Sequence, residues 1–86
     1  MYVRIDHKVE GAQVNRQDFL DHIKYLQGVS KERFFMGGGF KKKAGGMIVF
    51  AASDLDEAIK ISEADPLISR NLYTYEIVEW EMIIFS

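Results

Sequence analysis

The sequence predicts an α+β fold in which strands and helices follow one another in the order βαββαβ. Two observations predict it. Stretches with alternating apolar residues, typical of strands, are separated by two stretches in which apolar residues recur at helical spacing. The chain has 86 residues, enough for one small hydrophobic core. We therefore expect a single domain that spans residues 1–86.

The first strand and the first helix are predicted in the N-terminal third of the chain. Residues 2–9 alternate in the way typical of a strand with one polar face. One face carries Val3, Ile5, His7 and Val9, and the other carries Tyr2, Arg4, Asp6 and Lys8. Asn15 is a good N-cap, so a helix is expected from about residue 16 to residue 31.

Two further strands, residues 33–40 and 46–52, are predicted to form an antiparallel hairpin around residues 41–45. The first of them contains Gly37-Gly38-Gly39. Glycine inside a strand is costly because it has no side chain to pack and loses much conformational freedom on folding. The glycine run therefore predicts either a bulge or a place where a ligand or another backbone comes close.

The C-terminal third predicts a helix over about residues 54–63 and a last strand over residues 73–85. Between them, Asp65-Pro66 ends the helix, because proline disfavours the helical conformation in the preceding residue. A short helical turn is expected to restart at Pro66 and to reach Asn71. Right-handed crossovers then place both helices on one face of a four-stranded antiparallel sheet, which is the ferredoxin-like arrangement.

Both alternation classes of the last three strands contain apolar residues. Examples are the pairs Phe35 and Met36, Met47 and Ile48, and Ile77 and Val78. The sheet face opposite the helices is therefore expected to be apolar, and an exposed apolar sheet is an association surface. We expect a homodimer packed sheet to sheet, in a dimeric α+β barrel-type association.

Composition restricts the classes of partner and chemistry. The formal net charge of −2 supplies no attraction for nucleic acid or for an anionic membrane, so we expect neither as a partner. An RNA-recognition motif shares the βαββαβ order, but Ala44, Gly45 and Met47 stand where its third strand carries glycine and stacking rings. The absence of cysteine excludes disulfides and thiolate zinc sites. No signal peptide or apolar segment of about 20 residues is evident, so a cytoplasmic protein is expected.

His22 lies within the apolar stripe of the first predicted helix, together with Phe19, Ile23 and Leu26. Burying an unpaired ring nitrogen costs roughly 1–3 kcal/mol, so this histidine needs a hydrogen-bond partner or a wet pocket. It is either a satisfied core residue or part of a site. His7 is expected to make a local hydrogen bond, and two histidines without paired spacing predict no metal site.

Three segments resemble the YCII-related family of small dimeric ferredoxin-like proteins, which is similar in shape to muconolactone isomerases. Arg16 and the segment His22-Ile23-Lys24-Tyr25-Leu26 are similar to the family's R-x-x-H-L-x-x-L helix, with altered spacing. Residues 33–38 resemble its strand that ends at glycine, with Gly38 where the family often has proline. Residues 64–67, Ala-Asp-Pro-Leu, resemble its A-D-P segment. The resemblance covers nearly the whole chain.

The resemblance implies that His22 and Asp65 form a catalytic histidine–aspartate pair. A carboxylate bonded to one ring nitrogen fixes the tautomer and makes the other nitrogen a better proton acceptor. Asp65 is also suited to cap the turn that begins at Pro66, alone or in addition to that role. The remaining site residues that we expect to contact a substrate are Arg16, Gly37, Gly38 and Tyr73, with no cofactor and no metal.

The sequence therefore predicts a small-molecule enzyme of isomerase, lyase or hydrolase type, with general acid–base chemistry in a pocket near the dimer interface. The alternative is a non-catalytic small-ligand-binding or regulatory module on the same dimeric fold. The two differ in geometry, because an enzyme places a reactive ligand atom within about 3 Å of a ring nitrogen, whereas a module holds its ligand by apolar walls.

Overall fold

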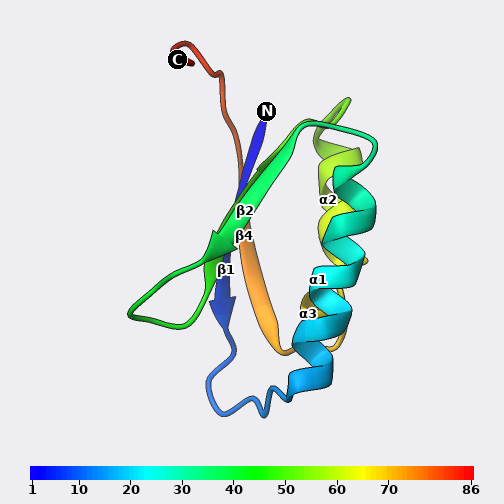
Figure 1. Cartoon of the computed structure of the whole chain (residues 1–86), viewed down its shortest axis with the longest axis vertical. Coiled ribbons are helices and arrows are strands. Elements are labelled where there is room, and N and C mark those ends of the chain that lie inside the picture. Colours follow the sequence, from blue (N-terminus) through cyan, green and yellow to red (C-terminus); the bar gives the residue numbers. More distant parts are fainter.

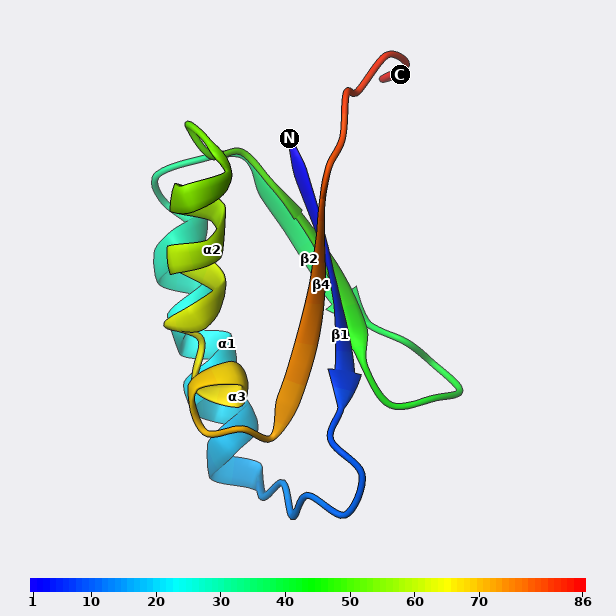
Figure 2. The same ribbon diagram turned by 180° about the vertical axis from the view of Figure 1, so that it is seen from behind.

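The computed structural model describes residues 1–86 and contains four strands and three helices (Figure 1). The strands are β1 (Tyr2–Lys8), β2 (Phe35–Gly39), β3 (Gly46–Phe50) and β4 (Tyr73–Glu79). The helices are α1 (Arg16–Ser30), α2 (Leu55–Glu63) and α3 (Pro66–Ser69). All three helices lie on one face of the sheet, and the opposite face carries no other element of the chain (Figures 1 and 2).

The sheet has the strand order β2-β3-β1-β4, and all neighbouring strands are antiparallel. β1 and β2 both pair with β3 and therefore run parallel, so α1 forms the crossover between them. α2 and α3 form the second crossover, from β3 to β4, on the same face. The predicted ferredoxin-like arrangement is confirmed, with α3 as a short additional helix.

Local sequence signals account for the helix ends. Asn15 caps α1 through a capping box with Asp18, whose side chain accepts from the backbone N–H of Asn15 at 3.0 Å. Asp54 caps α2 by accepting from the backbone N–H of Glu57 at 2.8 Å. Pro66 occupies the first position of α3, where its missing N–H costs nothing. The predicted helices are thus confirmed, and the last turn ends at Ser69 rather than Asn71.

The last strand is shorter than the sequence predicts. β4 ends at Glu79, and residues 80–86 form no regular structure. The reason lies in the neighbouring strand, because Glu79 pairs with Tyr2, the first residue of β1. One further backbone hydrogen bond, from Trp80 N–H to the Met1 carbonyl at 2.8 Å, ends the ladder. Residues beyond it are rich in β-forming side chains but have no strand to pair with.

The polar face of β1 faces the helices. Tyr2, Arg4 and Asp6 are buried, whereas Val3 and Ile5 lie on the opposite face and are only partly covered. A polar strand face ordinarily faces water, and here it is turned inward because its charged groups find partners there. This inversion places charged side chains directly below α1.

The core consists of two clusters on the helix side of the sheet. The larger cluster joins β1, β3, α1 and α2 through Tyr2, Leu26, Ile48, Phe50 and Ala58. The smaller cluster joins α3 and β4 through Leu67, Ile68 and Tyr73. None of the helices combines the length and the apolar character needed to cross a bilayer.

Candidate active site

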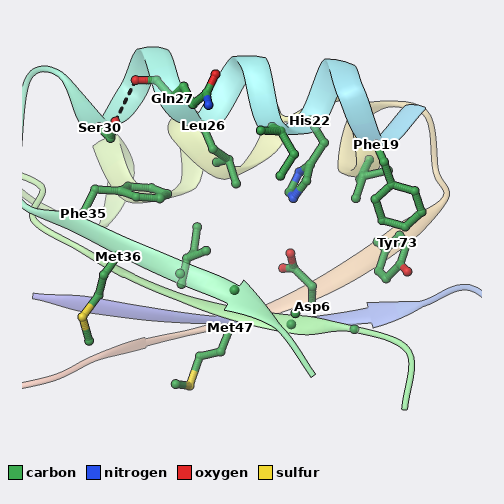
Figure 3. A pocket seen from close by; sticks show the side chains of 18 residues that line it. Asp6, Phe19, His22, Leu26, Gln27, Ser30, Phe35, Met36, Met47 and Tyr73 are labelled. Carbon is green, nitrogen blue, oxygen red and sulfur yellow. Dashed lines mark hydrogen bonds between the residues drawn. The ribbon is translucent and has the colours of Figure 1, made fainter. Parts of the chain in front are cut away.

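A cavity of about 470 Å³ lies between α1 and the sheet (Figure 3). Its walls are mostly apolar and include residues of both core clusters, among them Leu26, Ile48 and Leu67. His22 projects from α1 into it, and Asp6 projects toward His22 from the sheet (Figure 3). At the opposite end of the cavity, the Ser30 hydroxyl donates a hydrogen bond to the Gln27 carbonyl of the same helix at 2.7 Å. The cavity is therefore apolar with one charged end.

His22 and Asp65 are in direct contact. His22 Nδ1 lies 2.8 Å from both Oδ1 and Oδ2 of Asp65. Asp65 is fully buried behind the ring, and the His22 side chain is 14 % exposed. Asp65 Oδ1 also accepts from the Leu67 N–H at 3.0 Å and so caps α3. The aspartate therefore serves both as the partner of the histidine and as an N-cap.

The ionisation of Asp65 defines the tautomer of His22. Burial opposes ionisation of Asp65, but hydrogen bonds from His22 and Arg4 outweigh it, so the pKa of this carboxyl lies below its ordinary value. An ionised carboxylate only accepts hydrogen bonds, so Nδ1 must carry the proton. The neutral ring then has its lone pair on Nε2, and no group of the chain hydrogen-bonds that nitrogen. In the neutral form of His22, Nε2 is therefore the nitrogen that can accept a proton.

Arg4 connects the pair to a second carboxylate, a feature that the sequence reasoning missed. Arg4 Nη2 donates to Asp65 Oδ2 at 2.8 Å. Its Nε and Nη2 also donate to Asp6 Oδ1 and Oδ2 at 2.7 and 2.8 Å. The guanidinium is completely buried. The spacing of Arg4 and Asp6, two residues apart on one strand face, was an available signal, because opposite charges there can pair when that face is buried.

An exposed ion-pair cluster fixes α3 against α1. Arg70, directly after α3, donates to Asp18 and Asp21 of α1, each at 2.8 Å. Hydrogen bonds from Gln17 and Arg70 lower the pKa of Asp21. Because Asp65 precedes α3 and His22 follows Asp21, these contacts hold the two catalytic candidates in register.

Most of the residues predicted for the site come together. Gly37, Gly38 and Tyr73 line the cavity with His22, and Asp65 lies behind the ring. Arg16 does not: it is the first residue of α1, is exposed and is not part of the cavity wall. The structure therefore does not bring Arg16 to the cavity wall, and a contact between Arg16 and a ligand stays a prediction. The buried arginine of this region is Arg4.

The glycines form the floor of the cavity by permitting close approach. The register of β2 and β3 is continuous, so the predicted bulge is absent. At Gly37 a Cβ atom would collide with the side chain of Ile48 on β3. Gly45 has φ = +105°, which a side chain would strain, and any Cβ there would meet the Asp6 backbone oxygen. Within the glycine run, close packing is therefore found at Gly37, where the neighbour is the Ile48 side chain, whereas a Cβ atom at Gly38 would meet nothing within 4 Å.

Tyr73 and His7 complete the set of polar candidates. Tyr73 is buried at the cavity wall with its ring edge-to-face against Phe19, at 6.4 Å between centroids. Burial, reinforced by the negative charge of Asp6, raises the pKa of its hydroxyl. His7 is exposed, with Nε2 3.1 Å from Glu76 Oε2, as expected for a local hydrogen-bonding residue.

Comparisons with known proteins agree with this architecture. The sequence matches the model of the YCII-related domain over residues 1–81. It is 30% identical over 83 residues to the uncharacterized protein YjpA of Bacillus subtilis (strain 168), covering 95% of this chain and 98% of that protein. A similar solved structure is 5-chloro-2-hydroxyhydroquinone dehydrochlorinase (TftG) from Burkholderia phenoliruptrix AC1100, in complex with 2,5-dihydroxybenzoquinone. The TM-score is 0.73 at 22% identity, with 94% of each chain covered, which shows a shared fold.

Proposed function

Because this chain belongs to the YCII-related domain family, we propose that it is a small-molecule enzyme in which His22 transfers a proton to and from a ligand bound in the cavity. One observation carries the proposal. Nδ1 of His22 is bonded to a fully buried carboxylate, while the ring reaches into a cavity of about 470 Å³. Such a histidine–carboxylate pair is suited to general acid–base catalysis.

The proposed step begins with the neutral ring. Nε2 accepts a proton from a C–H or O–H bond of the ligand, and the electron pair of that bond stays on the ligand. The ring becomes an imidazolium, which the Asp65 carboxylate stabilises without itself taking the proton. The same proton returns to another atom of the ligand, or the electron pair expels a leaving group and the imidazolium then releases the proton to water. Asp65 touches no ligand and acts as the positioning residue.

The ligand that suits this cavity is a small ring compound. The apolar wall contributed by Phe19, Ile23 and Leu26 favours a flat apolar body. The titratable side chains of Asp6 and His22 lie at one end of the cavity (Figure 3). The solved structure of similar fold is a dehydrochlorinase with a dihydroxybenzoquinone bound. The compound bound in that structure supports a cyclic oxygenated ligand for this cavity.

We further propose that the protein is a homodimer packed through the open face of its sheet. Met36, Met47, Val78 and Trp80 are exposed on or next to that face. Met36 and Met47 also contribute to the cavity wall, although their side chains point to the other side of the sheet (Figure 3). A second copy seated there would therefore lie close to the rim of the cavity.

Turnover of a ring-compound panel tests the catalytic proposal. Chlorinated and hydroxylated hydroquinones and cyclic ketones are incubated in D2O, and chloride release and deuterium incorporation are measured. We expect His22→Asn and Asp65→Asn each to lower the rate by about a hundred- to ten-thousandfold, the usual worth of a positioned acid–base. His7→Asn, which alters the exposed second histidine, should leave it unchanged.

Ligand binding separates the enzyme from the alternative module. The His22→Asn variant should still bind the compound that the wild type turns over. Binding without turnover by the wild type would contradict the enzyme and establish a non-catalytic binding module. Full activity in both the His22 and the Asp65 variants would contradict the proposed roles of these two residues in the reaction.

A further inference from the structure

The charged end of the cavity contains more than the histidine pair. One completely buried guanidinium, that of Arg4, holds two carboxylates. Asp65 lies behind His22 and is closed off from the cavity, whereas Asp6 lines the cavity and is 6% exposed. The two aspartates therefore differ in access, although they share one cation.

Asp6 retains unused hydrogen-bonding capacity. A carboxylate offers about four lone-pair positions, two on each oxygen. Arg4 fills one on Oδ1 and one on Oδ2, at 2.7 and 2.8 Å, and no other donor of the chain reaches either oxygen. Figure 3 shows the carboxylate pointing toward the end of the cavity into which the His22 ring projects. The remaining acceptor positions thus face the end of the cavity that contains the His22 ring (Figure 3).

No cation balances Asp6 from the cavity side. The wall contains no lysine or arginine, and the guanidinium below is shared with Asp65. Around an apolar cavity of low dielectric, a carboxylate repels an anionic group and attracts a donor. A ligand hydroxyl group can donate a hydrogen bond to Asp6, whereas a ligand carboxylate is repelled by the negative charge of Asp6.

We propose that Asp6 is a ligand-contacting residue that accepts a hydrogen bond from a hydroxyl group of a ring ligand and excludes anionic ligands, with Arg4 as the residue that positions it. This inference rests on the proposed function in that it places the ligand next to His22. It deepens that function by naming the substrate class: an uncharged hydroxylated ring compound with its hydroxyl at the Asp6 end of the cavity.

Three probes that share one ring test the inference: phenol, anisole and benzoate. Phenol has a hydroxyl donor, anisole has a methyl ether in its place, and benzoate is an anion. Binding to the full chain at neutral pH is followed by the amide NMR shifts of Gly37, Gly38 and Gly39 on the cavity wall. The wild type should bind phenol about tenfold or more tightly than anisole, as expected for a hydrogen bond to a charged group. Benzoate should bind most weakly.

Asp6→Asn removes the charge at nearly constant shape. The preference for phenol over anisole should fall to about threefold or less, and benzoate should bind more tightly than it does to the wild type. Glu10→Gln, an exposed position in the loop after β1, changes the net charge equally and should alter neither ratio. Arg4→Lys keeps a cation but loses the two-pronged contact, so the phenol preference should also fall.

Equal binding of phenol and anisole by the wild type, or tight binding of benzoate, overturns the inference even if Asp6→Asn fails to fold. An unchanged phenol preference in a folded Asp6→Asn variant also overturns it and leaves Asp6 as the ion-pair partner of Arg4. In either case the proposed function stands if His22→Asn abolishes turnover. Failure of all three probes to move the cavity amides of the wild type also overturns the inference, and the proposed function is then decided by its own turnover test.

Discussion

At the scale of the residue, Asp65 combines two tasks that are ordinarily alternatives. Its Oδ1 caps α3, and both of its oxygens face His22 Nδ1. The residue is suited to both because it precedes Pro66, which starts the helix and leaves the aspartate in an extended conformation. With Arg4 as a third donor, the carboxylate is hydrogen-bonded from three directions although it is completely buried.

The lowered pKa of Asp65 predicts a pH dependence of stability. Because the folded-state pKa lies below the ordinary value of 3.8, the ionised carboxylate stabilises the fold above pH 3.8. This contribution is lost as the pH falls through the folded-state pKa. Asp65→Asn should therefore lower the free energy of unfolding near pH 7 by about 3 kcal/mol, as for a broken buried ion pair. The difference from the wild type should shrink below about pH 4.

Urea unfolding at several pH values measures this difference. Asp56→Asn is the control, because Asp56 is an exposed residue of α2 whose side chain makes no hydrogen bond. A difference between wild type and Asp65→Asn that stays constant down to pH 3 would show that the ionised carboxylate does not stabilise the fold.

At the scale of the element, β2 forms a regular strand although its sequence is poor in strand-forming residues. Three of its five residues are glycine, yet it pairs along its whole length with β3. Gly37 and Gly39 share the sheet face of Phe35, which faces α1, so side chains at these two positions would enter the space below α1. The low strand propensity of glycine disfavours a strand in this segment. The close packing of Gly37 against Ile48 explains why a glycine stands at that position.

Two substitutions in β2 test that explanation. Gly37→Ala forces a methyl group into the side chain of Ile48, a buried residue of the central strand β3. This substitution should lower the free energy of unfolding by about 1–3 kcal/mol. Gly39→Ala lies on the same face, and its Cβ would meet only the Gly45 carbonyl at an ordinary 3.8 Å. It should be neutral within about 0.5 kcal/mol. Denaturant unfolding that ranks the two variants in the opposite order would refute the packing argument.

At the scale of the whole molecule, the open sheet face and the C-terminal segment leave much apolar surface in solvent. Ile83, Ile84 and Phe85 are 83%, 86% and 75% exposed, beyond the end of β4. An exposed apolar surface of this kind is typical of an association site. The proposed homodimer would cover the sheet face and give the C-terminal segment a neighbour.

Sedimentation tests the homodimer. At micromolar concentration the wild type should have twice the chain mass of 9.9 kDa. Trp80→Glu should dissociate it, because an unpaired charge is costly to bury in an interface. Leu55→Glu introduces the same charge at an exposed residue of α2 and should leave the dimer intact. A wild-type monomer at that concentration would refute the proposed assembly.

The order of the elements, the helix caps and the pairing of His22 with Asp65 were predictable from the sequence, because each depends on local signals or on a motif. Asn15, Asp54 and Pro66 fix helix starts within a few residues of themselves. Only the tertiary structure decided which face of β1 is buried. Alternation separates two faces but does not say which one meets the helices, and burying Arg4 requires partners from the distant α2–α3 turn. The length of β4 was likewise decided by its neighbour, since a strand ends where its partner ends.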